Sequence, residues 1–280
     1  MNRAMTAAGD VLAPPHMQRA RGDGRIATQV RDGATHLQTL YQDGCAKIRL
    51  PNTHGQSLQA VLINTAGGLT GGDNIIWQAD AAPGARLVLT TQACERIYKS
   101  TGADARVATH LTAAANAHID WLPQETILFE NSRLRRTLDV DLADGATLCA
   151  VEAFILGREA MGEDARNAHL SDNWRIRRNG KLIHAEATKL SGDPLERENL
   201  SLLAGARAFA TIVYVGADAE TRLDATRALL GTKTRAGASV IGEKLVVRAI
   251  AESGLALRRI IAPVIASLSN AGTLPRLWHL

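Results

Sequence analysis

Residues 174–186 read Trp-Arg-Ile-Arg-Arg-Asn-Gly-Lys-Leu-Ile-His-Ala-Glu. The central pair Asn179-Gly180 supplies two residues that adopt positive φ readily, as a type I′ turn requires. The backbone of this turn matches the twist of two antiparallel strands. The segment therefore predicts a β-hairpin, with one strand over 174–178 and the other over 181–186.

Outward from this hairpin, further short strands with turn residues between them follow at spacings of about 8–12 residues, which is typical of all-β architecture. No helical pattern alternates with these strands, which disfavours a parallel α/β sheet. The expected strands lie at 35–42, 45–50, 58–63, 74–79, 85–91, 106–112, 117–122, 126–130, 134–142, 146–156 and 243–251.

Helical patterns appear only in the last quarter of the chain. Asp218 is expected to cap a helix over 219–230. Ser253 is expected to cap a second helix over 254–270, which should kink or break at Pro263 because proline has no backbone N–H. The predicted fold class is therefore all-β with a small C-terminal helical part.

The first 24 residues mix methionine, proline, glycine and arginine without periodicity and predict a flexible N-terminal tail. Residues 25–280 are then expected to form a single domain. Of the 280 residues, 46% are hydrophobic and 21% are charged, which is ordinary for a globular protein and excludes gross disorder.

Composition also excludes several classes of function. Aromatic residues make up 4% of the chain, which speaks against a stacking platform for nucleic acid. The three cysteines lack a C-x-x-C motif and the eight histidines are scattered, so neither a disulfide framework nor a permanent metal site is visible. Without an apolar run of about 18 residues or a secretory signal, we expect a cytoplasmic protein with no membrane segment.

The most distinctive stretch is Asn64-Thr-Ala-Gly-Gly-Leu-Thr-Gly-Gly-Asp73, which places two glycine pairs between strands. The dinucleotide pattern G-x-G-x-x-G fails at Leu69, and Asp73 stands where the lysine of a P-loop should be. A sharp connection with close backbone approach is favoured over a phosphate cradle.

Two further segments have a structural and a functional interpretation. Cys94 could be a nucleophile, but no histidine is tied to it by spacing, so an inert, partly buried thiol is favoured. Arg158 and Glu163 lie between glycines, where an ion pair that staples a bend is favoured over a polar pocket.

Several segments together resemble the UreD family of urease accessory proteins, called UreH in some bacteria. The matching segments follow the family's order and span roughly residues 25–280. They are Asn64–Asp73, Thr91-Gln92 followed by Arg96-Ile-Tyr98-Lys-Ser100, Trp121-Leu-Pro-Gln-Glu-Thr-Ile-Leu-Phe129, Gly157-Arg158 with Gly162-Glu163, and Leu274-Pro-Arg-Leu-Trp278.

The resemblance implies a non-enzymatic scaffold that joins UreF and the GTPase UreG, binds apo-urease and helps to place nickel in its active site. It also implies a superhelix of strands in stacked, β-helix-like sheets, no tightly bound cofactor, and transient contact with nickel. A polar tunnel for nickel has been proposed for the family. The basic helices over 219–230 and 254–270 are expected contact elements, and exchanging Arg258 and Arg259 for glutamate should weaken the complex without unfolding the chain.

Asp73 and Glu163 follow glycines in matching segments and are the candidate carboxylates for nickel transit. Loosely held Ni²⁺ is better served by oxygen ligands than by thiolates or clustered imidazoles. The structural alternative pairs Glu163 with Arg158, and Asp73 with backbone N–H groups. A second class of function stays open, a small-molecule enzyme with a polar pocket of Asp73, Glu95, Arg158 and Glu163.

Overall fold

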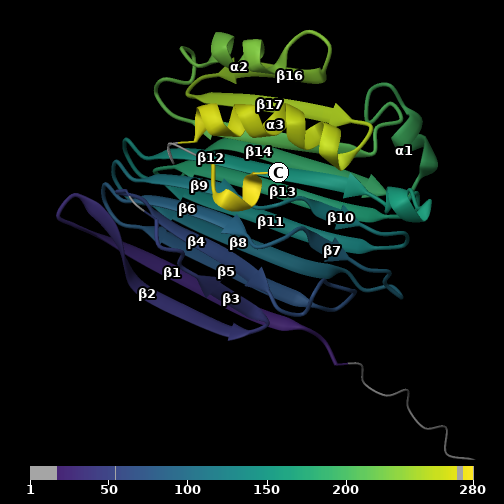
Figure 1. Ribbon diagram of the computed structural model, residues 1–280, viewed down its shortest axis with the longest axis horizontal. Coiled ribbons are helices and arrows are strands. Elements are labelled where there is room, and N and C mark those ends of the chain that lie inside the picture. Colours follow the sequence, from purple (N-terminus) through teal and green to yellow (C-terminus); the bar gives the residue numbers. More distant parts are fainter. Residues whose placement is uncertain (1–17, 54, 270–273, 280) are drawn as a thin grey trace, which may run out of the picture.

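The structure is a computed structural model that describes residues 18–53, 55–269 and 274–279, and its strands form two facing sheets (Figure 1). Sheet A has, in spatial order, β14 (Lys181–Ser191), β13 (His169–Arg178), β11 (Arg133–Leu142), β8 (Ala105–Ala113), β5 (Asn74–Ala81), β1 (Arg21–Arg31) and β2 (Ala34–Gly44). Sheet B has β16 (Arg235–Ile241), β17 (Lys244–Ala251), β15 (Ala208–Val215), β12 (Thr147–Leu156), β9 (His118–Leu122), β6 (Arg86–Thr91), β4 (Leu58–Asn64) and β3 (Ala46–Arg49), with β10 (Thr126–Leu128) pairing β12 and β7 (Glu95–Ile97) pairing β10.

Between β4 and β13 the chain moves back and forth between the two sheets. The strands β4, β6, β9 and β12 run parallel to one another in sheet B. The strands β5, β8, β11 and β13 do the same in sheet A. One strand of sheet B and the following strand of sheet A thus form one turn of a superhelix. The expected all-β fold of stacked, β-helix-like sheets is confirmed.

The hairpin that decided the fold prediction is present. β13 and β14 pair antiparallel, and Asn179 and Gly180 have φ of 49° and 77°. The turn at Asp43-Gly44 has a different role, because it carries the chain from β2 in sheet A to β3 in sheet B. A Cβ at Gly44 would lie 1.9 Å from the carbonyl oxygen of Arg21, so this corner requires glycine.

The C-terminal helical part covers the outer face of sheet B (Figure 1). Helix α3 (Gly254–Leu268) packs on β12, β15 and β17, and α2 (Leu223–Leu230) packs on α3 and β16. Because α3 covers it, β12 is buried at eight of its ten positions. The buried residues of α3 recur with helical period and are Leu257, Ile261, Val264, Ile265 and Leu268.

Three short helical elements complete the described chain: α1 (Pro194–Glu198), η1 (Glu159–Met161) and η2 (Arg276–Trp278). No helix in the described residues is long and apolar enough to cross a bilayer.

Two details of the helix prediction are corrected. Asp218 does not cap α2, which starts at Leu223; its carboxylate accepts hydrogen bonds from Tyr214 and Arg222 instead. Helix α3 is capped by Ser253 as expected, but it continues through Pro263. Pro263 is exposed, so the carbonyl that loses its helical partner lies on the solvent side of the helix.

The expected N-terminal tail differs at its last residues. Residues 1–17 lie outside the described part of the chain, and residues 18–20 have no regular structure. Arg21 to Gly24, which were expected in the tail, form the start of β1 and pair with both β2 and β5.

Candidate functional site

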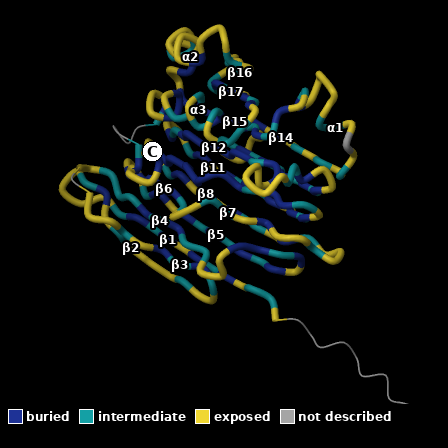
Figure 2. The backbone as a smooth tube through the Cα atoms, turned by 45° about the vertical axis from the view of Figure 1, so that its right-hand side comes forward, coloured by how far each residue is buried: buried dark blue, intermediate teal, exposed yellow. Residues whose placement is uncertain are grey.

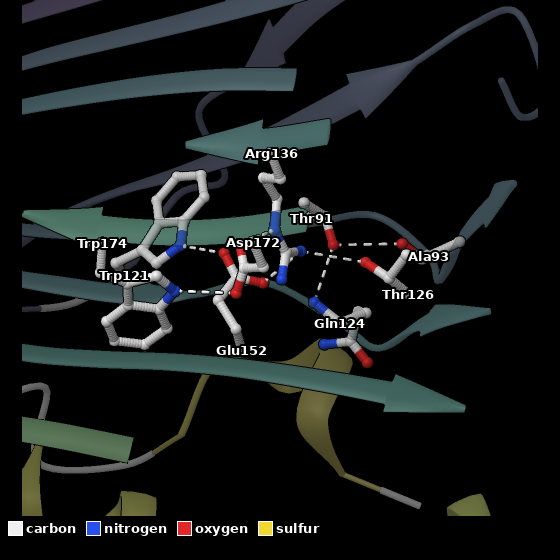
Figure 3. Close-up of polar contacts among 9 residues, drawn as sticks. All are labelled: Thr91, Ala93, Trp121, Gln124, Thr126, Arg136, Glu152, Asp172 and Trp174. Carbon is white, nitrogen blue, oxygen red and sulfur yellow. Dashed lines mark hydrogen bonds and ion pairs between the residues drawn. The ribbon is translucent and has the colours of Figure 1, made fainter. Parts of the chain in front are cut away.

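A cluster of three charged side chains lies between the two sheets, in the middle of the core (Figure 3). Arg136 on β11 donates from Nε to Oδ1 of Asp172 on β13 at 2.9 Å. Its Nη1 lies 2.5 Å from Oε2 of Glu152, which comes from β12 in the opposite sheet. None of the three residues is more than 6% exposed. One cation therefore holds two carboxylates from different sheets together, and we call the three residues the buried charge cluster.

Neutral donors complete the hydrogen bonding of the two carboxylates. The indole Nε1 of Trp121 donates to Oε1 of Glu152 at 2.9 Å, and that of Trp174 donates to Oδ2 of Asp172 at 2.9 Å. Arg136 also donates to the hydroxyl of Thr126 at 3.1 Å. Figure 3 shows both indoles on one side of the carboxylates and the guanidinium on the other. The cluster is therefore a rigid polar core that no single strand could build.

Two cavities that share part of their walls lie beside this cluster. The inner cavity, of about 50 Å³, is walled in part by Gln124, Arg136 and Glu152. The outer cavity, of about 290 Å³, lies beside Gly67, Gly68 and residues 91–96, some of which are exposed. Trp77, Thr91 and Glu95 line both cavities. The two cavities therefore share a wall that contains one carboxylate, and we call the two together the passage.

Glu95 occupies the shared wall and has no cation among its hydrogen-bond partners in the described chain. The amide nitrogen of Asn64 donates to both of its carboxylate oxygens at 3.1 Å. Burial raises the pKa of Glu95 to about 7, against the opposing effect of Asn64. Burial also raises the pKa of Glu152 to about 7, against the effect of Arg136. Both carboxylates can therefore exchange a proton near neutral pH.

Substitution of Glu95 by glutamine should remove a pH dependence of stability. The folded-state pKa of about 7 lies above the ordinary 4.5, so the favourable contribution of this carboxyl is complete below pH 4.5 and is lost as the pH rises through 7. The free energy of unfolding of wild type minus that of the variant should fall by at most about 3.5 kcal/mol between pH 4.5 and 7, at roughly 1.4 kcal/mol per pKa unit. Urea denaturation between pH 4 and 8 measures it.

Asp141→Asn is the control for the loss of one negative charge, because it removes an exposed carboxylate. Parallel profiles for wild type and Glu95→Gln would show that Glu95 keeps an ordinary pKa in the folded protein.

The glycine loop that walls the outer cavity has a structural reason for its composition. The backbone of Leu69 bonds to Arg96 and to Tyr98 of the segment around β7, at 2.8 Å and 2.7 Å. A Cβ at Gly68, whose φ is 141°, would lie 2.4 Å from the Tyr98 ring. The loop therefore requires glycine for a close approach of two backbones, as the favoured interpretation held.

Comparison with known proteins identifies the chain. The family model described as "UreD urease accessory protein" matches residues 20–279. This chain belongs to the UreD family. A urease accessory protein UreD of Chelativorans sp. (strain BNC1) is 63% identical over 96% of this chain and 97% of its own. Those of Rhizobium rhizogenes (strain K84) and Agrobacterium fabrum (strain C58) are 52% and 46% identical, over 94% and 97% of this chain and 96% and 95% of their own.

Members of the UreD family are accessory proteins of urease maturation and not enzymes, and the chain has that role. The alternative of a small-molecule enzyme is therefore wrong, and its four polar residues do not form one pocket. Arg158 and Glu163 bond to each other, Glu95 bonds to Asn64, and Asp73 bonds to backbone N–H groups. Of the four, Glu95 alone is among the residues that line the two cavities.

The two carboxylates predicted for nickel transit in this UreD protein have structural partners. Asp73, 5% exposed, accepts from the backbone N–H groups of Ala20 at 2.8 Å and Thr70 at 2.7 Å. Glu163 accepts from the backbone N–H of Glu130 at 2.6 Å and from Arg158 at 2.8 Å. Thr70 in the glycine loop and Arg158 are the partners that the structural alternative expected, whereas Ala20 and Glu130 are additional donors.

Arg258, predicted as an exposed contact residue, is instead part of the interior. Its guanidinium bonds Glu125 at 2.8 Å, also bonds Gln124, and lies 4.9 Å from the centre of the Trp278 ring. Exchanging it for glutamate would place two carboxylates together, so for Arg258 we expect the exchange to destabilise the fold. Arg259 is exposed.

Cys94 lies beside the ion pair of Arg258 and Glu125, with its Sγ 3.4 Å from Oε2 of Glu125. Burial raises the pKa of its thiol to about 11, with a further effect from Glu125. A thiol with this pKa is protonated at neutral pH and is a poor nucleophile, which agrees with the inert interpretation. In the part of the chain that the structure describes, no three His, Cys, Asp or Glu residues are grouped so that they could hold a metal ion.

Proposed function

We propose that this protein acts in the cytoplasm with UreF and UreG on apo-urease, and that Ni²⁺ on its way to the urease active site passes through the outer and inner cavities. The urease maturation role follows from the family, whereas the partners, the metal and the route are the proposal. The observation that carries the route is the carboxylate-lined passage into the core.

A protein that served only as a scaffold would gain little from such an interior. Replacing buried ion pairs with well-packed apolar side chains is often neutral or stabilising, so the buried charge cluster is weak support for a purely structural role. A polar lining, in contrast, lowers the cost of moving a hydrated cation through the core. The carboxylates of Glu95 and Glu152 stand in walls that are otherwise largely apolar, an exception that function explains.

The carboxylates of the passage suit transit rather than storage. Glu95 stands at the wall between the cavities, and Glu152 stands at the inner end beside Arg136. Oxygen ligands hold Ni²⁺ less tightly than sulfur or clustered nitrogen. A carboxylate whose pKa is about 7 also gives up the metal to a competing proton, and the charge of Arg136 opposes tight binding next to Glu152.

Asp73 and Glu163 remain proposals for transit, but Glu95 is the stronger candidate. The oxygens of Asp73 and Glu163 are occupied by backbone or arginine donors. Those of Glu95 accept from the Asn64 amide and from the backbone of Arg96, and neither oxygen pairs with a cation in the described chain, which leaves them able to exchange the Asn64 hydrogen bond for a metal contact.

The proposed function is tested in a urease-positive cell that lacks its own UreD gene. The tagged chain should restore urease activity in nickel-containing medium and should co-purify with UreF, UreG and apo-urease. Apo-urease that is activated equally well without this chain, or a chain that binds none of the three proteins, would contradict the proposal.

A further inference from the structure

Two segments far apart in the sequence meet at one end of the superhelix. The first, residues 157–168, joins β12 to β13 and contains η1; the second, residues 192–207, joins β14 to β15 and contains α1. Arg197 donates to the carbonyl of Asp164, and Arg207 donates to that of Glu163 at 2.7 Å. In Figure 1 both segments lie at the right-hand end of the sheets. We call their joint outer face the loop-end surface.

Large apolar side chains are unusually exposed on the loop-end surface, which Figure 2 shows as exposed chain around α1. Leu200 is 89% exposed, Met161 71%, Leu195 68% and Leu202 53%. These are four of the five most exposed large apolar side chains in the described residues. Single exposed leucines are normal, but a concentration of them on two adjoining segments is typical of a protein interaction site.

A pocket of about 210 Å³ with an excess of positive charge opens between the same two segments. Arg166, Arg197 and Arg207 line it, together with Asp164 and Glu198. Both carboxylates are used by Arg166, at 2.9 Å and 3.5 Å.

Arg197 and Arg207 have no carboxylate within ion-pair distance in the described chain, and their hydrogen bonds go to backbone carbonyls. Burial lowers the pKa of Arg197, against the opposing effect of the Asp164 carboxylate, and the nearby charges of Arg207 and Arg166 lower it further. The pocket therefore holds two guanidinium groups that form no ion pair within the described residues.

We propose that the loop-end surface is a docking site for a protein segment that inserts a carboxylate, from an aspartate, a glutamate or a chain end, between Arg197 and Arg207 and covers the exposed leucines with apolar side chains. Guanidinium groups bind carboxylates with paired hydrogen bonds, which supplies orientation, and the apolar rim supplies buried area. The inference rests on the proposed function, because it assigns one of the proteins of urease maturation to this surface.

The apolar part is tested with Leu200→Asp, which puts a charge where an apolar contact is expected. Affinity of the full-length chain for purified UreF and for purified apo-urease is measured separately by biolayer interferometry. Leu200→Asp should weaken binding to one of the two at least about tenfold, as truncation of a central interface side chain does. Ile241→Asp on β16, where the isoleucine is 63% exposed, is the matched control and should bind as the wild type does.

The charged part is tested with Arg166→Glu, which reverses the charge balance of the pocket without removing the two arginines that hold the loops together. It should weaken binding of the same partner and reduce the salt dependence of that binding. Arg135→Glu on β11, an exposed arginine that pairs with Asp104, is its control.

The outcomes separate this inference from the proposed function. Wild type that binds a partner, with Leu200→Asp and Arg166→Glu binding it equally well, overturns the docking surface alone. Wild type that binds neither protein overturns the proposed function and the docking surface with it. Sedimentation that shows a wild-type dimer broken by Leu200→Asp would assign the surface to a second copy of this chain and would also overturn the proposal.

Discussion

Replacing Arg136 by methionine should lower the free energy of unfolding by about 3–5 kcal/mol, the usual effect of removing one partner from a buried ion pair. The guanidinium is the one cation that bonds Asp172 and Glu152 in the described core, and it links sheet A to sheet B. Without it, two carboxylates remain in a region of low polarity, each with a single indole donor. Repulsion between the two carboxylates and the cost of keeping them away from water then both destabilise the folded state.

Urea denaturation at pH 8, where Glu152 is ionised, measures the loss. Arg135→Met is the control on the same strand. The side chain of Arg135 is 60% exposed, so its removal should change the free energy of unfolding by less than about 0.5 kcal/mol. The triple variant Arg136→Met, Glu152→Gln, Asp172→Asn should recover most of the lost stability, because no unpaired charge remains. A single variant as stable as Arg135→Met would show that Arg136 does not carry the charge balance of the cluster.

Elements that depend on local chemistry were predictable from the sequence. The Asn179-Gly180 turn and the Ser253 cap involve neighbouring residues only, and both are present in the structure. Strand β15 (Ala208–Val215) was not predicted, because an apolar run buried on both faces has no alternation. The residue pattern did not predict the parallel pairing either, since it joins strands that are two to four elements apart along the chain and no local signal encodes it.

The buried charge cluster left a signal that went unused. On β11, Leu134, Leu138 and Val140 point into the core, and Arg136 occupies the inward position between them. On β13, Asp172 stands in the same way between Leu170 and Trp174. An ionisable residue in the inward phase of an alternating strand must find a partner inside. The identity of that partner depends on how the two sheets are aligned against each other, and the sequence does not predict this alignment.

Glu95 is the position at which substitution should abolish function without harming the fold. Glu95→Lys places a positive charge on the wall that the two cavities share, and Glu95→Gln removes the carboxylate at nearly constant shape. A charge-assisted oxygen contact contributes roughly 1.5–3 kcal/mol, so activation of urease in the complemented cell should fall about tenfold or more with glutamine. Activation of urease by Glu95→Lys should be lower still, because the ammonium group of the lysine repels the cation throughout the passage.

A structural defect would give a different pattern. Since burial of the ionised carboxylate is unfavourable, Glu95→Gln should be at least as stable as wild type at pH 8 and should co-purify with the same partners in the same yield. Asp141→Lys, which changes the net charge of the chain as Glu95→Lys does, lies on the exposed face of β11 and should activate urease normally. Full activation by both Glu95 variants would exclude this passage as the nickel route, whereas lost activation with intact complexes assigns the defect to the metal's path.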